Sequence, residues 1–178
     1  DVGDERAVKE FCINSIEFLG GLDCLVNNAG VAGPTLSIEE IDAEDWSHCL
    51  NVCLSSQFYF VKSCLKQLRK SSSASIVNLS SAAGKYGFAF RTPYASAKWG
   101  VIGLTKSLSI ELGKEKIRVN AVLPGLVAGV RQQNVLRNKA QMLGKSFNEV
   151  EEEALSFTSI KEYVDAKDIA DQIMYLAS

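Results

Sequence analysis

The sequence lacks several features that mark specialised classes of protein. None of its apolar runs is long enough to cross a bilayer, and its first ten residues are rich in charge, unlike a signal peptide. The formal net charge is only -2, with 19 Lys and Arg against 21 Asp and Glu. That balance gives no reason to expect nucleic acid or an anionic membrane as a partner. We therefore expect a cytoplasmic protein that binds neither.

Histidine is nearly absent, and cysteine occurs in an odd number. His48 is the single histidine, and Cys49 and Cys53 follow it on an expected helix. A CxxxC pair with one histidine lacks the close CxxC spacing of zinc sites, so we expect no metal site. The five cysteines are expected to be reduced, structural thiols.

Short apolar segments alternate with helical patterns along the 178 residues, a length that fits one domain. This alternation predicts an α/β fold, with a doubly wound parallel sheet between helices in three layers, α/β/α. We expect strands at 22–27, 75–80 and 116–122, and helices at 7–19, 42–69, 93–112, 131–143, 149–157 and 166–177.

Polar and turn residues follow each expected strand. They are Asn27-Asn28-Ala29-Gly30, Ser80-Ser81 and Pro124-Gly125. Because the carboxyl ends of parallel strands meet at one edge of a sheet, and ligands bind beyond that edge, these groups are expected to converge on an active site.

Tyr94 and Lys98 form the most informative pair. Thr92 as N-cap and Pro93 as first helical residue predict a helix start, which places Tyr94 and Lys98 one turn apart on one face. A nearby ammonium favours the phenolate, so such a tyrosine exchanges protons with an alcohol or carbonyl oxygen. A surface tyrosine with a cation–π contact is the alternative.

Four blocks in this order resemble the short-chain dehydrogenase/reductase family over the whole chain. They are Asn27-Asn28-Ala29-Gly30, Ile76-Val77-Asn78-Leu79-Ser80-Ser81, Tyr94-xxx-Lys98 and Val119-Asn120-Ala121-Val122-Leu123-Pro124-Gly125. Ser81 precedes Tyr94 by thirteen residues, as the family pattern requires. The resemblance implies a Rossmann-like fold and an NAD(P)-dependent oxidoreductase that interconverts a secondary alcohol and a ketone of a small-molecule substrate.

The resemblance also implies roles for single residues. Tyr94 is similar to the general acid/base, and Ser81 to the group that orients the substrate oxygen. Lys98 is similar to the residue that binds the nicotinamide ribose and lowers the tyrosine pKa. Asn51 resembles the asparagine that holds a water in a proton relay to Lys98, on a helix expected to be largely buried; a solvent-facing polar residue is the alternative.

The cofactor, NAD or NADP, has its own implied contacts. Asp1 and Val2 resemble the segment at the adenine ring, and Asn27, Ala29 and Gly30 the part that lines the cofactor. Pro124, Gly125 and Val127 resemble the turn that meets the nicotinamide carboxamide. Tyr94 and Lys98 complete the set of implied cofactor contacts.

The chain departs from the family pattern in two places. It contains no GxGxxG turn, and it opens where the resemblance places the end of the third family strand. We therefore expect 1–178 to be a single, partial Rossmann-type domain that lacks the N-terminal βαβ unit and the last strand. Gly129 also stands where many members have threonine after the Pro-Gly turn.

The segment 129–159 is expected to form a helical substrate lid. Met142, Leu143, Phe147, Leu155 and Phe157 would supply its apolar inner side. Packing of these residues on the domain surface or on a neighbouring subunit is the alternative.

The helices at 42–69 and 93–112 are apolar on more than one face, which favours a homodimer or homotetramer. The missing glycine-rich turn also motivates another function, that of a catalytically silent or truncated homologue acting as a binding or dimerisation module. An epimerase or dehydratase on the same scaffold is a third possibility.

Overall fold

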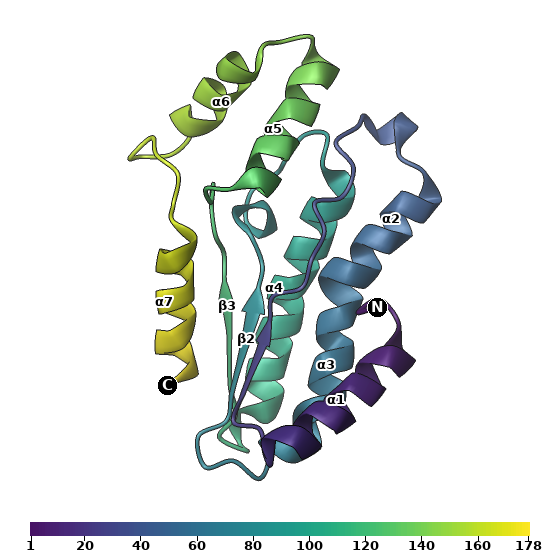
Figure 1. Ribbon diagram of the computed structural model, residues 1–178, viewed down its shortest axis with the longest axis vertical. Helices are drawn as coiled ribbons and strands as arrows, with labels where there is room; N and C mark the ends of the chain where they lie inside the picture. Colours follow the sequence, from purple (N-terminus) through teal and green to yellow (C-terminus); the bar gives the residue numbers. More distant parts are fainter.

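Residues 1–178, all of which the computed structural model describes, are organised around a three-stranded sheet (Figure 1). The strands are β1 (Cys24–Asn27), β2 (Ser75–Leu79) and β3 (Arg118–Val122). They pair in the order β1-β2-β3 and are all parallel. Every residue of the central strand β2 is buried, as expected of a strand covered on both faces.

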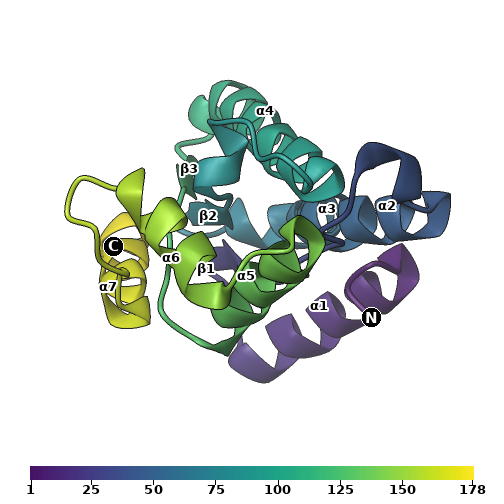
Figure 2. The ribbon, with the colours of Figure 1, turned by 90° about the horizontal axis from the view of Figure 1, so that it is seen from above.

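Helices lie on both faces of this sheet, which confirms the three-layer prediction (Figure 2). On one face, α3 (Ser56–Leu68) and α4 (Thr92–Gly113) pack on the strands, and α1 (Glu5–Leu19) packs on α3. On the other face, α7 (Ala166–Ala177) contacts β2 and β3. The alternation of side chains along β2 serves both layers, since Ile76 belongs to the first core and Val77 to the second.

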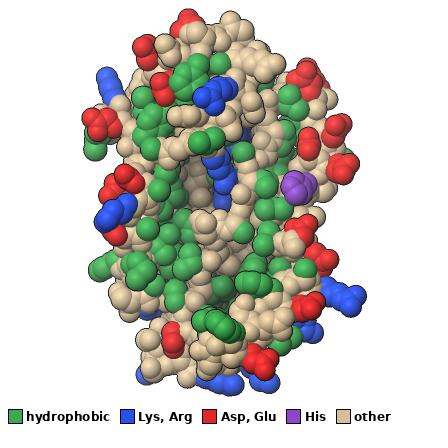
Figure 3. All heavy atoms as spheres, viewed as in Figure 1, with side chains coloured by type: hydrophobic (Ala, Val, Ile, Leu, Met, Phe, Trp, Pro, Cys, Tyr) green, Lys and Arg blue, Asp and Glu red, His purple; other side chains and the backbone are tan.

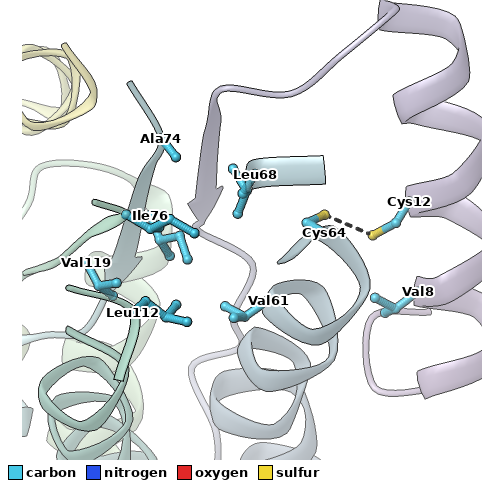
Figure 4. Close-up of a cluster of buried hydrophobic side chains, with 10 residues drawn as sticks. Val8, Cys12, Val61, Cys64, Leu68, Ala74, Ile76, Leu112 and Val119 are labelled. Carbon is cyan, nitrogen blue, oxygen red and sulfur yellow. Dashed lines mark hydrogen bonds between the residues drawn. The ribbon is translucent and has the colours of Figure 1, made fainter. Parts of the chain in front are cut away.

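The larger core lies between the sheet, α1, α3 and the end of α4 (Figure 4). Leu68, Ile76 and Leu112 are fully buried at its centre. Cys12 and Cys64 meet across α1 and α3 with their sulfurs 3.6 Å apart, as a thiol hydrogen bond. All five cysteines are free thiols, as the sequence predicts.

The long helical segment expected at 42–69 is confirmed, with Asp42 as its N-cap, but it contains a π-helical turn in the middle. α2 (Ala43–Leu50) passes into a π-helical turn, η2 (Asn51–Ser55), before α3 begins. The Ser56 hydroxyl donates to the Val52 carbonyl at 2.7 Å within this turn. Such a turn holds one extra residue and recurs at functional sites, and it rotates the residues that follow it relative to α2.

Smaller corrections concern element ends. Arg91, and not Thr92, occupies the N-cap of α4, and Thr92 is the first helical residue. The strands are one or two residues shorter than expected. The remaining elements are η1 (Ile38–Glu40), η3 (Ala82–Gly84), α5 (Val130–Leu143) and α6 (Phe147–Ser156). No helix has both the length and the apolar character needed to cross a membrane.

The turn after β2 lies unusually close to α4. A Cβ at Gly84 would lie 2.4 Å from Ser80 Oγ and 2.6 Å from the Lys98 carbonyl oxygen, distances that no real side chain tolerates. Glycine at position 84 therefore allows η3 to approach the backbone of α4 at Lys98.

Replacing Gly84 with alanine should lower the free energy of unfolding by about 1 to 3 kcal/mol, the usual cost of inserting an atom into a packed site. Urea denaturation measures this loss. Gly87→Ala is the matched control, because a Cβ there has no neighbour within 4 Å. Equal denaturation midpoints for the two variants would contradict the close approach.

Candidate active site

The carboxyl ends of the strands bring two of the predicted polar segments together. The Ser80 amide donates to the Val122 carbonyl at 2.9 Å, and the Ala82 amide donates to the Pro124 carbonyl at 2.9 Å. Ser80-Ser81 and Pro124-Gly125 therefore lie side by side beyond the sheet, as the parallel topology requires.

Asn27 at the end of β1 is tied to the middle strand. It is buried, and its Nδ2 donates to Asn78 Oδ1 at 2.8 Å. Asn78 in turn donates to Thr105 Oγ1 at 3.0 Å, and Thr105 donates to the Val101 carbonyl on α4. This chain of satisfied buried polar groups sets the position of β1 relative to α4.

Lys98 lies under the sheet edge with its charged end inside the protein. The residue is 3% exposed, and its Nζ donates to the Leu79 carbonyl at 2.7 Å. Ser80 Oγ donates to the Lys98 carbonyl at 2.8 Å, so both ends of the residue are held by the end of β2. Burial lowers the pKa of Lys98, because the charged ammonium is desolvated, and Cys53 opposes that shift.

The Tyr94 ring lies close to two cations. Lys98 Nζ is 5.6 Å from the ring centroid, and the Arg91 guanidinium carbon is 4.3 Å from it. Tyr94 is half-buried, yet its hydroxyl has no hydrogen-bond partner in the chain and is not sealed from solvent. That hydroxyl is therefore free to meet an oxygen of a ligand.

Ser81 presents a hydroxyl with its proton unused. It is the N-cap of η3, and its Oγ accepts from the Ala83 amide at 3.2 Å. Because the oxygen is the acceptor in this contact, the O–H remains able to donate to a ligand.

Asn51 does not lie where the sequence analysis expects it. It is exposed, its Cβ faces Gly3, and its Oδ1 accepts only a long hydrogen bond from Ser55 at 3.4 Å. The π-helical turn instead buries Cys53, the residue two positions later. A Cβ at Gly30 would lie 3.6 Å from Cys53 Sγ and 3.9 Å from Lys98 Nζ, so Cys53 and Lys98 border the same point.

Cys49 and Cys53 are buried in one cluster and act electrostatically on Lys98. The hydrogen bond from Cys49, aided by the charges of Lys98 and Arg131, lowers the pKa of Cys53 to about 6, against the opposing effect of burial. The same hydrogen bond together with burial raises the pKa of Cys49. The Cys53 thiol itself donates to the Val31 carbonyl at 3.4 Å.

Two arginines that the sequence analysis missed hold the loop after β1. Arg131, at the start of α5, donates to the Gly30 carbonyl at 3.1 Å and to the Val31 carbonyl at 2.8 Å. Arg91 donates to the Ala32 carbonyl at 2.6 Å. The only signal for Arg91 in the sequence is its place one turn before Tyr94, and Arg131 has none.

The other residues expected at the cofactor are more scattered. Asp1 is exposed and accepts from the Gly3 amide, and Val2 packs on the larger core. Val127 pairs with Val164 in an isolated bridge, two residues before Gly129 with its φ of 141°. Ala29 is exposed beside the half-buried Gly30.

The segment 129–159 forms two helices that pack on each other. Leu136, Ala140 and Val150 form their shared core, with Phe147 against it. Phe157 is 85% exposed and lies outside this shared core. Arg131 connects the first of these helices to the loop over Lys98.

Comparison with known proteins places these observations in context. The family model described as short chain dehydrogenase matches residues 1–140. A trans-4-hydroxycyclohexanecarboxylate dehydrogenase of Sinomonas cyclohexanicum is 36% identical over 92% of this chain and 56% of its own length. The 3-oxoacyl-[acyl-carrier-protein] reductase of Thermotoga maritima is 34% identical over 100% of this chain and 68% of its own length.

The fold also matches that of solved structures. The F189W actinorhodin polyketide ketoreductase with NADPH superposes with a TM-score of 0.92 at 30% identity, over 100% of this chain and 69% of that chain. The chain thus spans little more than half to about two thirds of the length of these relatives.

The burial of Lys98 predicts a pH-dependent stability. Its pKa is lowered in the folded state, so between that value and the unfolded value near 10.5 the unfolded chain binds more protons, and stability rises with pH. Wild type should therefore gain stability relative to Lys98→Met as pH rises from neutral toward 10.5, measured by urea denaturation. Gln57 still donates to the Leu79 carbonyl in this variant.

Lys106→Met, which removes an exposed lysine of the same helix, serves as the control. Its stability difference from wild type should stay flat over the same pH range. A flat difference for Lys98→Met as well would show that the ammonium is not desolvated.

Proposed function

The chain belongs to the short-chain dehydrogenase family, and from this premise we propose that it forms the catalytic part of an NAD(P)-dependent oxidoreductase. The reaction is the interconversion of a secondary alcohol and a ketone. The observation that carries this proposal is the buried Lys98 ammonium beside the free Tyr94 hydroxyl at the carboxyl end of β2.

Tyr94 is the proposed general acid and base. In the direction of ketone reduction its hydroxyl gives a proton to the substrate oxygen, and in the reverse direction its phenolate takes that proton back. Lys98 Nζ and the Arg91 guanidinium carbon lie 5.6 Å and 4.3 Å from the centroid of its ring. The unused O–H of Ser81 donates to the same substrate oxygen, where charge develops in the transition state.

Lys98 fits the sugar of a nicotinamide nucleotide. Its ammonium has three donors, and only one has a partner in the chain, the Leu79 carbonyl. The two remaining donors suit neighbouring ribose hydroxyls, and Asn27, Gly30 and Pro124 are the proposed further contacts. When bound, the nicotinamide supplies or accepts the hydride.

The proposed substrate is a small alcohol or ketone, and the proposed lid over it is the segment 129–159. The position of Arg131, joined to the loop above Lys98, supports a lid at this place. The relatives named above act on a cyclic hydroxy acid and on an acyl-carrier-protein thioester, so substrate size varies among similar chains.

We also propose that the protein is a homodimer or homotetramer and that it acts in the reducing environment of the cytoplasm. Phe58 on α3 and Trp99 on α4 are 46% and 52% exposed, which leaves apolar surface on the two helices that the sequence analysis singled out. The free state of all five cysteines fits a reducing compartment.

Tyr94→Phe should lower kcat by roughly 10²- to 10⁴-fold, the usual contribution of a positioned acid or base, while the cofactor still binds. Steady-state kinetics measure the first effect, and quenching of tryptophan fluorescence by NAD(P)H measures the second. Tyr86→Phe is the matched control, since Tyr86 is 59% exposed and should leave both quantities unchanged.

Near-normal kcat in Tyr94→Phe would show that the acid/base assignment is wrong. Lys98→Ala should weaken cofactor binding and lower kcat together. If the full protein binds neither NAD(H) nor NADP(H), a silent homologue that acts as a binding module replaces the enzyme. Cofactor binding without net oxidation or reduction would favour an epimerase or dehydratase.

The oligomer is tested separately by sedimentation velocity over a dilution series. We expect a dimer or tetramer at micromolar concentration, because exposed aromatic side chains on helices are the usual core of such interfaces. Trp99→Glu should shift the distribution toward the monomer. A wild-type protein that stays monomeric at micromolar concentration contradicts this proposal.

A further inference from the structure

The candidate site contains more positive charge than its own residues balance. Arg131 lies close enough to Arg91 and to Lys98 to act on both electrostatically, and the other groups that act on these two are Tyr94, on Arg91, and the thiols of Cys49 and Cys53. The four ion pairs of the chain all lie elsewhere. Figure 3 shows the corresponding hollow on one face of the molecule, with Lys and Arg atoms inside it and acidic side chains only toward the periphery.

Arg91 is the cation with the most unused hydrogen-bonding capacity. Only its Nη2 has a partner, the Ala32 carbonyl at 2.6 Å. Nη1 has no partner and is not buried, while Nε is buried without a partner. A guanidinium that is largely withdrawn from water normally pairs with a carboxylate, and this chain provides none.

The backbone around Arg91 keeps its guanidinium in place. Phe90, the residue before it, adopts a left-handed φ of 65°, which is unusual for a bulky side chain. The Phe90 carbonyl accepts from the Leu36 amide at 3.0 Å, so the segment before α4 is joined to the loop after β1. With the guanidinium stacked 4.3 Å from the Tyr94 ring, the free Nη1 lies next to the proposed acid/base.

We propose that Arg91 binds a carboxylate of the substrate, and that the protein therefore acts on hydroxy acids and their oxo acids. This inference rests on the proposed function and adds the substrate class to it. Nη1 has no partner in the chain, so it can donate a charge-assisted hydrogen bond to a carboxylate oxygen. The alcohol carbon of the same molecule then lies at Tyr94 and Ser81.

The other two cations are less suited to this role. Both Nη atoms of Arg131 already donate hydrogen bonds, to the Gly30 and Val31 carbonyls. Lys98 is buried and faces the Leu79 carbonyl, where the nucleotide sugar is proposed. A phosphate of the cofactor is the other anion that Arg91 could bind, and the experiment separates the two sources.

The first test needs no variant. Lactate, 3-hydroxybutyrate and 4-hydroxycyclohexanecarboxylate are titrated into the full protein in the presence of NAD+ by calorimetry, each beside its neutral amide. At least one carboxylate should bind roughly tenfold or more tightly than its amide, because a charge-assisted hydrogen bond is lost in the amide. If no carboxylate binds more tightly than its amide, the proposal is wrong.

The second test assigns the effect to Arg91. Arg91→Gln should remove the preference for carboxylate over amide, and Arg91→Lys should retain part of it. Affinity for NAD+ and NADP+ should stay unchanged in Arg91→Gln; a loss of cofactor affinity with an intact carboxylate preference would assign Arg91 to a cofactor phosphate and overturn the proposal. Arg137→Gln, an exposed arginine of α5, should leave the preference as in wild type.

The outcomes for the substrate class and for the reaction remain separate. In Arg91→Gln, the KM for the acid should rise, while kcat on a neutral alcohol should stay as in wild type. If no alcohol is oxidised but the carboxylate preference depends on Arg91, the anion site stands and the proposed function fails. If neutral alcohols are oxidised and Arg91→Gln changes nothing, the proposed function stands and the anion site fails.

Discussion

The hydrogen bond from the Lys98 ammonium to the Leu79 carbonyl joins α4 to the end of the central strand, and the arrangement of the site depends on it. The Ser80 hydroxyl donates to the carbonyl of the same residue, and Gly84 leaves the space that this second contact requires. Since Tyr94 precedes Lys98 by one helical turn, fixing Lys98 also fixes the place of the tyrosine ring. A buried ammonium is unfavourable unless it is paired, so this geometry is maintained by the compensation that Leu79 and the Cys53 sulfur provide.

The electrostatics of the site follow from the same burial. Three cations surround the loop of Gly30, Val31 and Ala32, and backbone carbonyls rather than acidic side chains accept their hydrogen bonds. Carbonyl dipoles hold cations in place but leave their net charge intact. The site is thus organised in advance for negative charge, both on a reacting oxygen and on a carboxylate beside it.

Much of the fold follows from local pattern, whereas parts of the site do not. Apolar runs bounded by turns predict all three strands, and helical periodicity predicts every long helix within a few residues. The π-helical turn at Asn51–Ser55 is missed because an inserted residue leaves the apolar pattern nearly unchanged. Each residue of a helix advances by about 100°, so an inserted residue changes which side chains face Lys98. Hence Asn51 is exposed and Cys53 is buried beside the ammonium.

The sequence by itself determined the order of strands and helices, the family, and the pairing of Tyr94 with Lys98, because neighbours one turn apart on a helix meet whatever the rest of the chain does. The tertiary structure alone decided that Arg91 and Arg131 hold the loop after β1, and that Arg91 keeps unused donors next to Tyr94. The partners in these contacts are 59 and 100 residues apart along the chain. No local spacing encodes such contacts; they arise only when the packing of α4 and α5 over the sheet edge brings Arg91 to the Ala32 carbonyl and Arg131 to the Gly30 and Val31 carbonyls.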